Sequence, residues 1–153
     1  MTGMLDDLEI LLKQTGRKIL FVGIGNVLKQ DDGAGVYISG RIAERDNIKT
    51  LTVEVSIENY IGKINSLKPD ILVLIDCMDT GSPPGSVVFL PLEEVTDITF
   101  NTHNISLKNL AAFFTSEVYI LGIQPATIDF GENISDIVRI ASDDIINLIN
   151  KRR

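Results

Sequence analysis

The chain has 153 residues, 44% of them hydrophobic and 23% charged, a composition typical of one soluble globular domain. Its formal net charge of −7 argues against nucleic acid and anionic membranes as partners, because both are bound through clustered Lys and Arg. One cysteine cannot make an internal disulfide or a cysteine-rich zinc site. No apolar run reaches the ~20 residues that span a bilayer. The N-terminus also lacks the pattern of a signal peptide, so we expect a cytoplasmic protein.

Apolar runs and segments of helical spacing follow one another along the chain. In order, we expect a helix at 1–17, a strand at 18–23, a helix at 34–46, a strand at 51–55, a helix at 58–67, strands at 70–76 and 86–90, a helix at about 105–114, a strand at 117–122 and a helix at 134–149. Strands that alternate with helices predict a mostly parallel sheet with helices on both faces. The sequence therefore predicts one three-layer α/β/α domain over 1–153, with about five strands and with residues 1–17 as an N-terminal helical extension.

Polar residues that follow the expected strands are candidates for function, because ligands of open α/β sheets bind outside the carboxyl ends of the strands. Three loops qualify. The glycine-rich segment 23–35 follows the first strand and contains Asp31 and Asp32. Asp76 ends the most apolar strand, and His103, the single histidine, precedes the expected helix at about 105.

Each candidate also has an ordinary structural explanation. The glycine-rich loop does not fit a dinucleotide site, since Leu28 stands where the third glycine belongs and two adjacent carboxylates would repel a pyrophosphate. Asp31 or Asp32 is expected to cap the following helix. Asp76 would cap a turn, and a lone histidine is more often a surface or core residue. Cys77 is expected to point into packing if Asp76 faces the crevice, which argues against a cysteine protease.

The three loops together are more specific than any one of them. Two carboxylates and one imidazole, from Asp32, Asp76 and His103, form an O,O,N ligand set that suits a borderline divalent ion such as nickel or zinc. Acids in a loop that leads into a helix are better explained as ligands of a cation or as proton acceptors. The residues therefore indicate a cation-dependent or acid–base site.

The pattern Gly23-x-Gly25-Asn26-x-Leu28-x-x-Asp31-Asp32-Gly33-x-Gly35 resembles the N-terminal signature of the hydrogenase maturation endopeptidases. An Asp after the third parallel strand and a Thr-His-Asn that opens a helix occur at similar positions in that family. Here they are Asp76 and Thr102-His103-Asn104. The segment Leu121-Gly-Ile-Gln-Pro125 resembles the subgroup that processes energy-converting hydrogenases and its relatives for F420-reducing enzymes. The likeness extends in order from residue 18 to the neighbourhood of residue 150.

The resemblance implies an endopeptidase that removes a short C-terminal peptide from the nickel-loaded precursor of a nickel–iron hydrogenase large subunit. It implies catalytic and metal-contacting roles for Asp32, Asp76 and His103, and substrate contacts for Asn26 and Asp31. The precursor would supply the nickel, and zinc, cadmium or calcium is also expected to fit the site. An aspartic-type route, with a carboxylate as general base, and a metal-dependent route both stay open. We expect a monomer that meets the precursor tail transiently.

Two features depart from the family pattern. After the second strand the family often has Gly-Gly, whereas this chain has Val55-Ser-Ile-Glu-Asn59, so the substrate groove is expected to differ locally. Residues 1–17 precede the usual start, and their helix is expected to cover the sheet. Two other functions stay open. One is a non-enzymatic nickel chaperone or sensor, and the other is an esterase like peptidyl-tRNA hydrolase, which needs a basic face that a charge of −7 disfavours.

Overall fold

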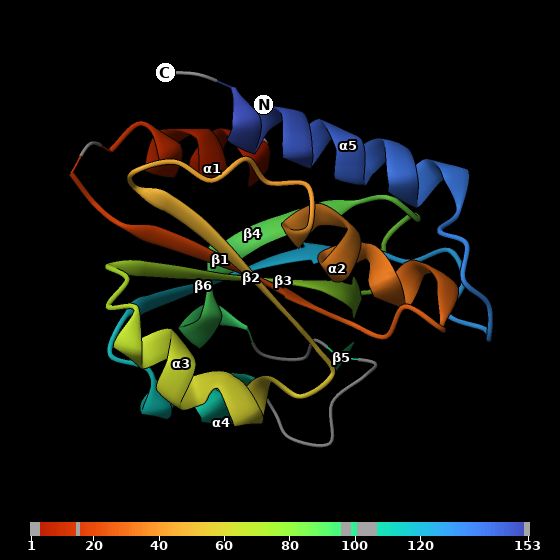
Figure 1. Ribbon diagram of the computed structural model, residues 1–153. Coiled ribbons are helices and arrows are strands. Elements are labelled where there is room, and N and C mark those ends of the chain that lie inside the picture. The colour runs from red at the N-terminus through yellow and green to blue at the C-terminus, as the bar shows by residue number, and fades with distance from the viewer. Residues whose placement is uncertain (1–3, 15, 96–98, 101–106, 152–153) are drawn as a thin grey trace.

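The most apolar run of the chain forms the middle strand of a twisted sheet that lies between two layers of helices (Figure 1). The computed structural model describes residues 4–14, 16–95, 99–100 and 107–151. The strands are β1 (Ile19–Ile24), β2 (Ile48–Glu54), β3 (Ile71–Asp79), β4 (Val87–Pro91), β5 (Thr99–Phe100) and β6 (Glu117–Ile123). Their order is β2-β1-β3-β6-β4, with β5 paired to the far end of β3. Along this path β4 runs antiparallel to β6 and the other pairs are parallel, which confirms the mostly parallel sheet.

Helices connect the strands and cover both faces of the sheet. The α-helices are α1 (Met4–Leu12), α2 (Ala34–Ser39), α3 (Ile61–Ser66), α4 (Leu107–Leu110) and α5 (Asp136–Asn150). Short 3-10 helices are η1 (Gln30–Gly33), η2 (Ile57–Tyr60), η3 (Leu92–Glu94) and η4 (Ala111–Phe113). Within the described ranges, no helix is long and apolar enough to cross a membrane.

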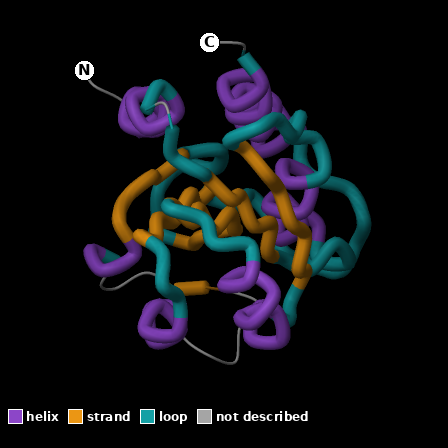
Figure 2. The backbone as a smooth tube through the Cα atoms, turned by 60° about the vertical axis from the view of Figure 1, so that its left-hand side comes forward, coloured by secondary structure: helices purple, strands orange, loops and turns teal. Residues whose placement is uncertain are grey.

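The core divides into two parts because side chains alternate along each strand. On β3, Ile71, Val73 and Ile75 pack with α1, α2 and α5, whereas Leu72 and Leu74 pack with α3 and the segment around α4. Both views show α1 and α5 side by side on one face and α3 with α4 on the other (Figures 1 and 2). The helix expected within residues 1–17 therefore covers the sheet, where α1 contacts β4 and α5.

The predicted helix at 34–46 is too long, because α2 ends at Ser39. Gly40 follows as the C-terminal cap, and the chain then turns toward β2. The Asn150 side chain of α5 holds this turn: its Oδ1 accepts the Ala43 N–H at 2.8 Å and its Nδ2 donates to the Arg41 carbonyl at 2.9 Å. Tertiary hydrogen bonds from a helix far along the chain thus replace further helical turns.

Three other predictions need correction. The helix expected near 105–114 is divided into α4 and η4, and Phe114 is already extended, although Leu110 and Phe114 are buried as the spacing predicts. The strand predicted at 51–55 begins three residues earlier and ends one residue sooner, since β2 covers Ile48–Glu54. The strand predicted at 70–76 continues to Asp79, because β5 pairs with Met78 and Asp79.

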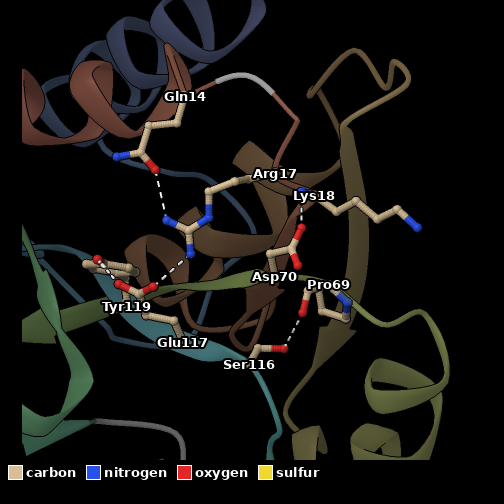
Figure 3. A network of polar contacts seen from close by, with 8 residues as sticks. All are labelled: Gln14, Arg17, Lys18, Pro69, Asp70, Ser116, Glu117 and Tyr119. Carbon is tan, nitrogen blue, oxygen red and sulfur yellow. Dashed lines mark hydrogen bonds and ion pairs between the residues drawn. The ribbon is translucent and has the colours of Figure 1, made fainter.

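A polar network closes the amino-terminal ends of the strands (Figure 3). The Arg17 guanidinium donates to the Gln14 side chain at 2.9 Å and to the Glu117 carboxylate at 2.8 Å, and the Tyr119 hydroxyl donates to the same carboxylate. The hydrogen bond from Tyr119 is the larger cause, and that from Arg17 the second, of a lowered pKa of Glu117. The same hydrogen bond to Glu117 raises the pKa of Tyr119 to about 12. Perturbed groups often mark active sites. These lie at the opposite end of the strands from the carboxyl-end loops, so they are structural.

Candidate active site

The sheet changes direction of winding between β1 and β3, which makes their carboxyl ends the topological switch point of the sheet. From β1 the chain moves to β2 at one edge, and it then returns past β1 to form β3 on the other side. In open α/β sheets, ligands bind at such a switch point. Asp32 follows β1 within η1, and Asp76 comes one residue after Ile75, the last residue of β3 that pairs with β1. The structure places both predicted carboxylates at the switch point, where η1 contacts β3.

Two glycines of the first loop allow its backbone to press onto the strand ends. A Cβ on Gly35 would stand 2.3 Å from the carbonyl oxygens of both Ile24 and Ile75, so a side chain there would push α2 away from β1 and β3. Gly25 has φ +149°, and its Cβ would stand 2.0 Å from the Asp32 carbonyl oxygen. The glycine pattern therefore serves close packing that brings the acidic loop to the end of β3, and no phosphate is needed to explain it.

Asp32 and Asp76 are both fully buried, with 0% of either residue exposed. Asp32 Oδ2 accepts the Asn26 N–H at 3.4 Å, and Asp76 Oδ1 accepts the Cys77 N–H at 2.7 Å. Along β3, Leu74 and Met78 pack on the α3 side of the sheet, so alternation places Asp76 on that side and Cys77 on the other. Because the low dielectric of the interior weakens the screening of charge, a buried carboxylate interacts more strongly with a nearby ion than an exposed carboxylate does.

Asp31 has a different environment from Asp32. Its Oδ2 accepts the N–H groups of Ala126 at 2.8 Å and Thr127 at 3.1 Å and the Ser135 hydroxyl at 2.8 Å, while its Oδ1 accepts the Ser135 N–H at 2.7 Å. The side chain is fully buried. Both oxygens therefore bind the chain itself, which indicates that Asp31 positions these loops, and its expected contact with substrate stays a prediction.

The expected capping of α2 by one of the two acids is wrong. The N-cap of α2 is Gly33, without a side-chain cap bond. Asp31 instead binds Ser135, the N-cap of α5, where a carboxylate is favourable near the positive end of the helix dipole. Since β3 lies between β1 and β6, these bonds join the loops on either side of the strand that carries Asp76.

His103, the third expected ligand, lies outside the described residues, so its role stays a prediction. Phe100, the nearest described residue before it, pairs with Met78 two positions beyond Asp76. Among the described residues there is no group of three His, Cys, Asp or Glu side chains placed to hold a metal. The two carboxylates supply the oxygen donors that such a set requires.

Gln124 fixes the strand end beyond Asp76, a function that the sequence signalled only through the Leu121–Pro125 motif. It is 8% exposed, its Oε1 accepts the Thr80 N–H at 2.7 Å, and its Nε2 donates to Asp79 Oδ1 at 3.0 Å. The hydrogen bond from Gln124, and to a smaller extent one from the Gly81 N–H, lowers the pKa of Asp79. Gln124, which directly follows β6, therefore links the end of β6 to the end of β3 at Asp79 and Thr80.

Comparisons with known proteins identify the family and match the fold. The family described as hydrogenase maturation protease, of the HycI type, matches residues 37–152. A protein of Methanocaldococcus jannaschii assigned to the hydrogenase maturation proteases is 33% identical over 147 residues, which cover 87% of this chain and 86% of the relative. The chain belongs to the hydrogenase maturation protease family.

Other members of the family agree in sequence and in shape. The hydrogenase 3 maturation protease of Escherichia coli is 29% identical over 113 residues, which are 70% of this chain and 72% of that protein. The crystal structure of a [NiFe] hydrogenase maturation protease, HycI, from Thermococcus kodakarensis superposes with a TM-score of 0.82 and 25% identity, covering 94% of this chain and 96% of that one. Membership makes this chain a peptidase and confirms the family named from the motifs.

Cys77 offers a direct test of the catalytic class of this protease. It is fully buried on the face of the sheet opposite to Asp76, where a small apolar side chain suits the packing. We expect Cys77→Ala to cleave at a rate within about twofold of the parent protein, since surface-inaccessible thiols of this kind are inert. Cleavage is followed by mass spectrometry, with circular dichroism as the control for folding. A folded but inactive variant would restore the cysteine-protease hypothesis.

Proposed function

We propose that this protease removes a short C-terminal peptide from the nickel-loaded precursor of a nickel–iron hydrogenase large subunit. The single observation that carries the proposal is the pair of fully buried carboxylates, Asp32 and Asp76, at the switch point of the sheet. The relatives support the class of substrate, since they are maturation proteases of [NiFe] hydrogenase and of hydrogenase 3. The Leu121–Pro125 motif supports the energy-converting or F420-reducing subgroup.

The chemistry of the two acids favours a cation brought by the substrate. Burying two carboxylates at one edge of a sheet costs desolvation free energy, which a nearby divalent ion offsets. Asp32 and Asp76, with His103 as the predicted third ligand, form a set suited to nickel and also to zinc, cadmium or calcium. On this proposal the nickel is part of the precursor, and an incomplete ligand set has little affinity until the precursor supplies the remaining ligands. The protease thereby checks that nickel has been inserted.

Hydrolysis then needs a water molecule that attacks the scissile carbonyl carbon. Asp32 or Asp76 takes a proton from this water as general base, or the nickel of the substrate polarises the carbonyl. The C–N bond breaks, the carboxyl group stays on the large subunit, and the amine of the released peptide takes up the proton. Asn26 is the proposed substrate contact of this loop: its backbone N–H donates to Asp32 Oδ2, and its side-chain Oδ1 accepts the Leu28 N–H.

The test uses purified large-subunit precursor in nickel-loaded and nickel-free forms, incubated with the protease and weighed by mass spectrometry. We expect loss of a short C-terminal peptide from the nickel-loaded form, at a rate at least about 10²-fold above that of the nickel-free form. Without nickel, the proposed ligands share no ion with the precursor through which to bind it. Nickel binding by the protease alone, measured by calorimetry, is expected to be weak.

Two results would contradict this proposal. Equal cleavage of both forms would remove the nickel checkpoint but keep the peptidase. Tight nickel binding by the chain alone, without cleavage of either form, would favour the alternative of a nickel chaperone or sensor. The Asp32→Asn protein is the negative control for the cleavage assay and for the nickel titration, because it lacks the carboxylate and is expected to keep the fold.

A further inference from the structure

Two hollows lie at the amino-terminal ends of the strands, at the opposite end of the sheet from the proposed active site. One, of about 600 Å³, lies between the end of α1 and the turn that precedes β2. The other, of about 200 Å³, lies between that turn and the loop that precedes β3. Lys18, Asp46 and Asn47 line both hollows, so they form a shared wall. We call the two hollows together the amino-end groove.

The charged side chains that line the amino-end groove are mostly cations, although the whole chain has a formal net charge of −7. Lys13 and Arg45 line the larger hollow, Lys49 lines the smaller, and Lys18 lines both, whereas Asp46 is the one carboxylate among the described lining residues. The three lysines are exposed, and none of them forms an ion pair with another described residue. In Figure 3 the Lys18 side chain extends away from the polar network. Its ammonium group therefore faces solvent, where a partner can reach it.

Two ordinary roles for these cations do not account for the groove. The first is to neutralise neighbouring carboxylates, but Asp70 accepts the backbone N–H of Lys18 at 2.7 Å and Glu117 pairs with Arg17 at 2.8 Å, so neither carboxylate engages a lysine ammonium group of the groove. The second is to protect an edge strand from pairing with another sheet. It explains Lys49, which lies on β2, but not the cations outside that strand. The groove is therefore suited to an anionic partner.

The groove also has apolar surface, which selects among anionic partners. Leu67 is 42% exposed and lines the smaller hollow, and Leu12 and Ile48 line the larger one. Among the residues that the structure describes, no aromatic side chain lines either hollow, so the bases of a nucleic acid have no ring on which to stack. The net charge of −7 also repels a long polyanion. A peptide that combines carboxylates with aliphatic side chains fits both the charge and the apolar surface.

We propose that the amino-end groove binds an extended acidic segment of a partner protein, with carboxylates at Lys18 and Lys49 and an aliphatic side chain at Leu67. Complementary charge of this kind speeds association and fixes the orientation of the bound segment. β1 separates the groove from the loop of Asp32, and its six residues span ~20 Å. A segment in the groove therefore leaves the switch point of the sheet open. The groove holds the protease to an acidic protein while a second molecule occupies the active site, and this inference does not rest on the proposed function.

The first experiment tests binding with a panel of fluorescent peptides of about ten residues, in which Asp and Glu are interspersed with Leu, Ile and Ser. Each peptide has a neutral analogue with Asn and Gln in place of the acids, and binding to the full chain is measured by fluorescence anisotropy. We expect at least one acidic peptide to bind with a Kd below about 100 µM, and its analogue to bind about tenfold more weakly. Binding should also weaken as added salt screens the charges. If no acidic peptide binds more tightly than its analogue, the proposal is wrong.

The second experiment locates the bound peptide on the protein. The double variant Lys18→Gln and Lys49→Gln is expected to weaken binding about tenfold, because each exposed ion pair contributes up to about fivefold. The double variant Lys63→Gln and Arg139→Gln is the matched control, since it changes the net charge equally at residues that line neither hollow. Circular dichroism confirms that both proteins are folded. Equal losses in the two double variants would overturn the groove as the binding site.

The third experiment tests the chemical class of the occupant. Leu67→Ser is expected to weaken peptide binding about threefold, whereas Ile10→Ser, which changes a residue that is 61% exposed on α1 and lines neither hollow, should not. Tripolyphosphate and an oligouridylate of about ten nucleotides then compete with the bound peptide. Displacement by either one at the concentration of the peptide would show a general anion site or a nucleic-acid site, and would overturn the acidic segment. Little displacement, together with the loss in Leu67→Ser, supports it. No precursor is present in these measurements, so they hold whether or not the proposed cleavage is observed.

Discussion

Asp32→Asn is expected to lower the rate of precursor cleavage by at least about 10²-fold, and Asp76→Asn to do the same, because a positioned general base contributes about 10²–10⁴ in rate. An amide keeps the shape of the carboxyl group but cannot take a proton from water, and it is a weaker ligand for a divalent ion. The sequence pattern predicts a similar loss of rate for His103→Ala. The rate is measured by mass spectrometry with nickel-loaded precursor in excess.

The structure predicts that these losses occur in folded protein. Asn can still accept the Cys77 N–H that Asp76 Oδ1 accepts, and it removes a buried charge, so the free energy of unfolding should change by less than about 1.5 kcal/mol. Urea unfolding followed by circular dichroism measures this change. Full activity in any one variant would exclude that residue from the reaction. A collapse of stability would instead assign the residue to the core.

The strands follow from local sequence, and the structure confirms each of the predicted strands with small shifts in their ends. Runs such as Ile71–Ile75 are apolar at every position, which favours a buried parallel strand, because both faces of the sheet are covered. The rule that ligands bind at carboxyl ends then gave Asp32 and Asp76 without knowledge of strand order. The structure places both, fully buried, at the switch point of the sheet, and family membership supports the peptidase.

The features that sequence reasoning missed depend on contacts between distant segments. The early end of α2 depends on Asn150, and the role of Asp31 depends on Ser135, about a hundred positions away. The two adjacent acids are indistinguishable by residue type, and only tertiary structure separates Asp31, which binds the loops before α5, from Asp32, which faces the Asn26 N–H. A bulge in β2 at Glu54 has no local signal either, since it arises from a shift in register between β1 and β2.

Asp31→Ala is expected to reduce the free energy of unfolding by about 3–5 kcal/mol, although Asp31 lies beside Asp32, the proposed catalytic acid. The change removes the charged acceptor of the part-buried N–H groups of Ala126, Thr127 and Ser135, and a hydrogen bond to a charged group contributes about 1.5–3 kcal/mol. In a chain of this size, the midpoint of thermal unfolding should fall by about 10 °C or more. Asp31→Asn should lie in between, because the amide keeps one acceptor oxygen but turns an N–H group toward other donors.

Asp136→Ala is the matched control for this prediction, since Asp136 also lies at the start of α5 but its side chain is 92% exposed. It should cost less than about 1 kcal/mol, the range of a single charge near a helix dipole. Unfolding by heat and by urea is compared for the three variants and the parent protein. Equal stability of Asp31→Ala and Asp136→Ala would contradict the positioning role. Asp31 would then be available to substrate, as the family resemblance implied. In that case Asp31→Ala should raise KM and leave the free energy of unfolding unchanged.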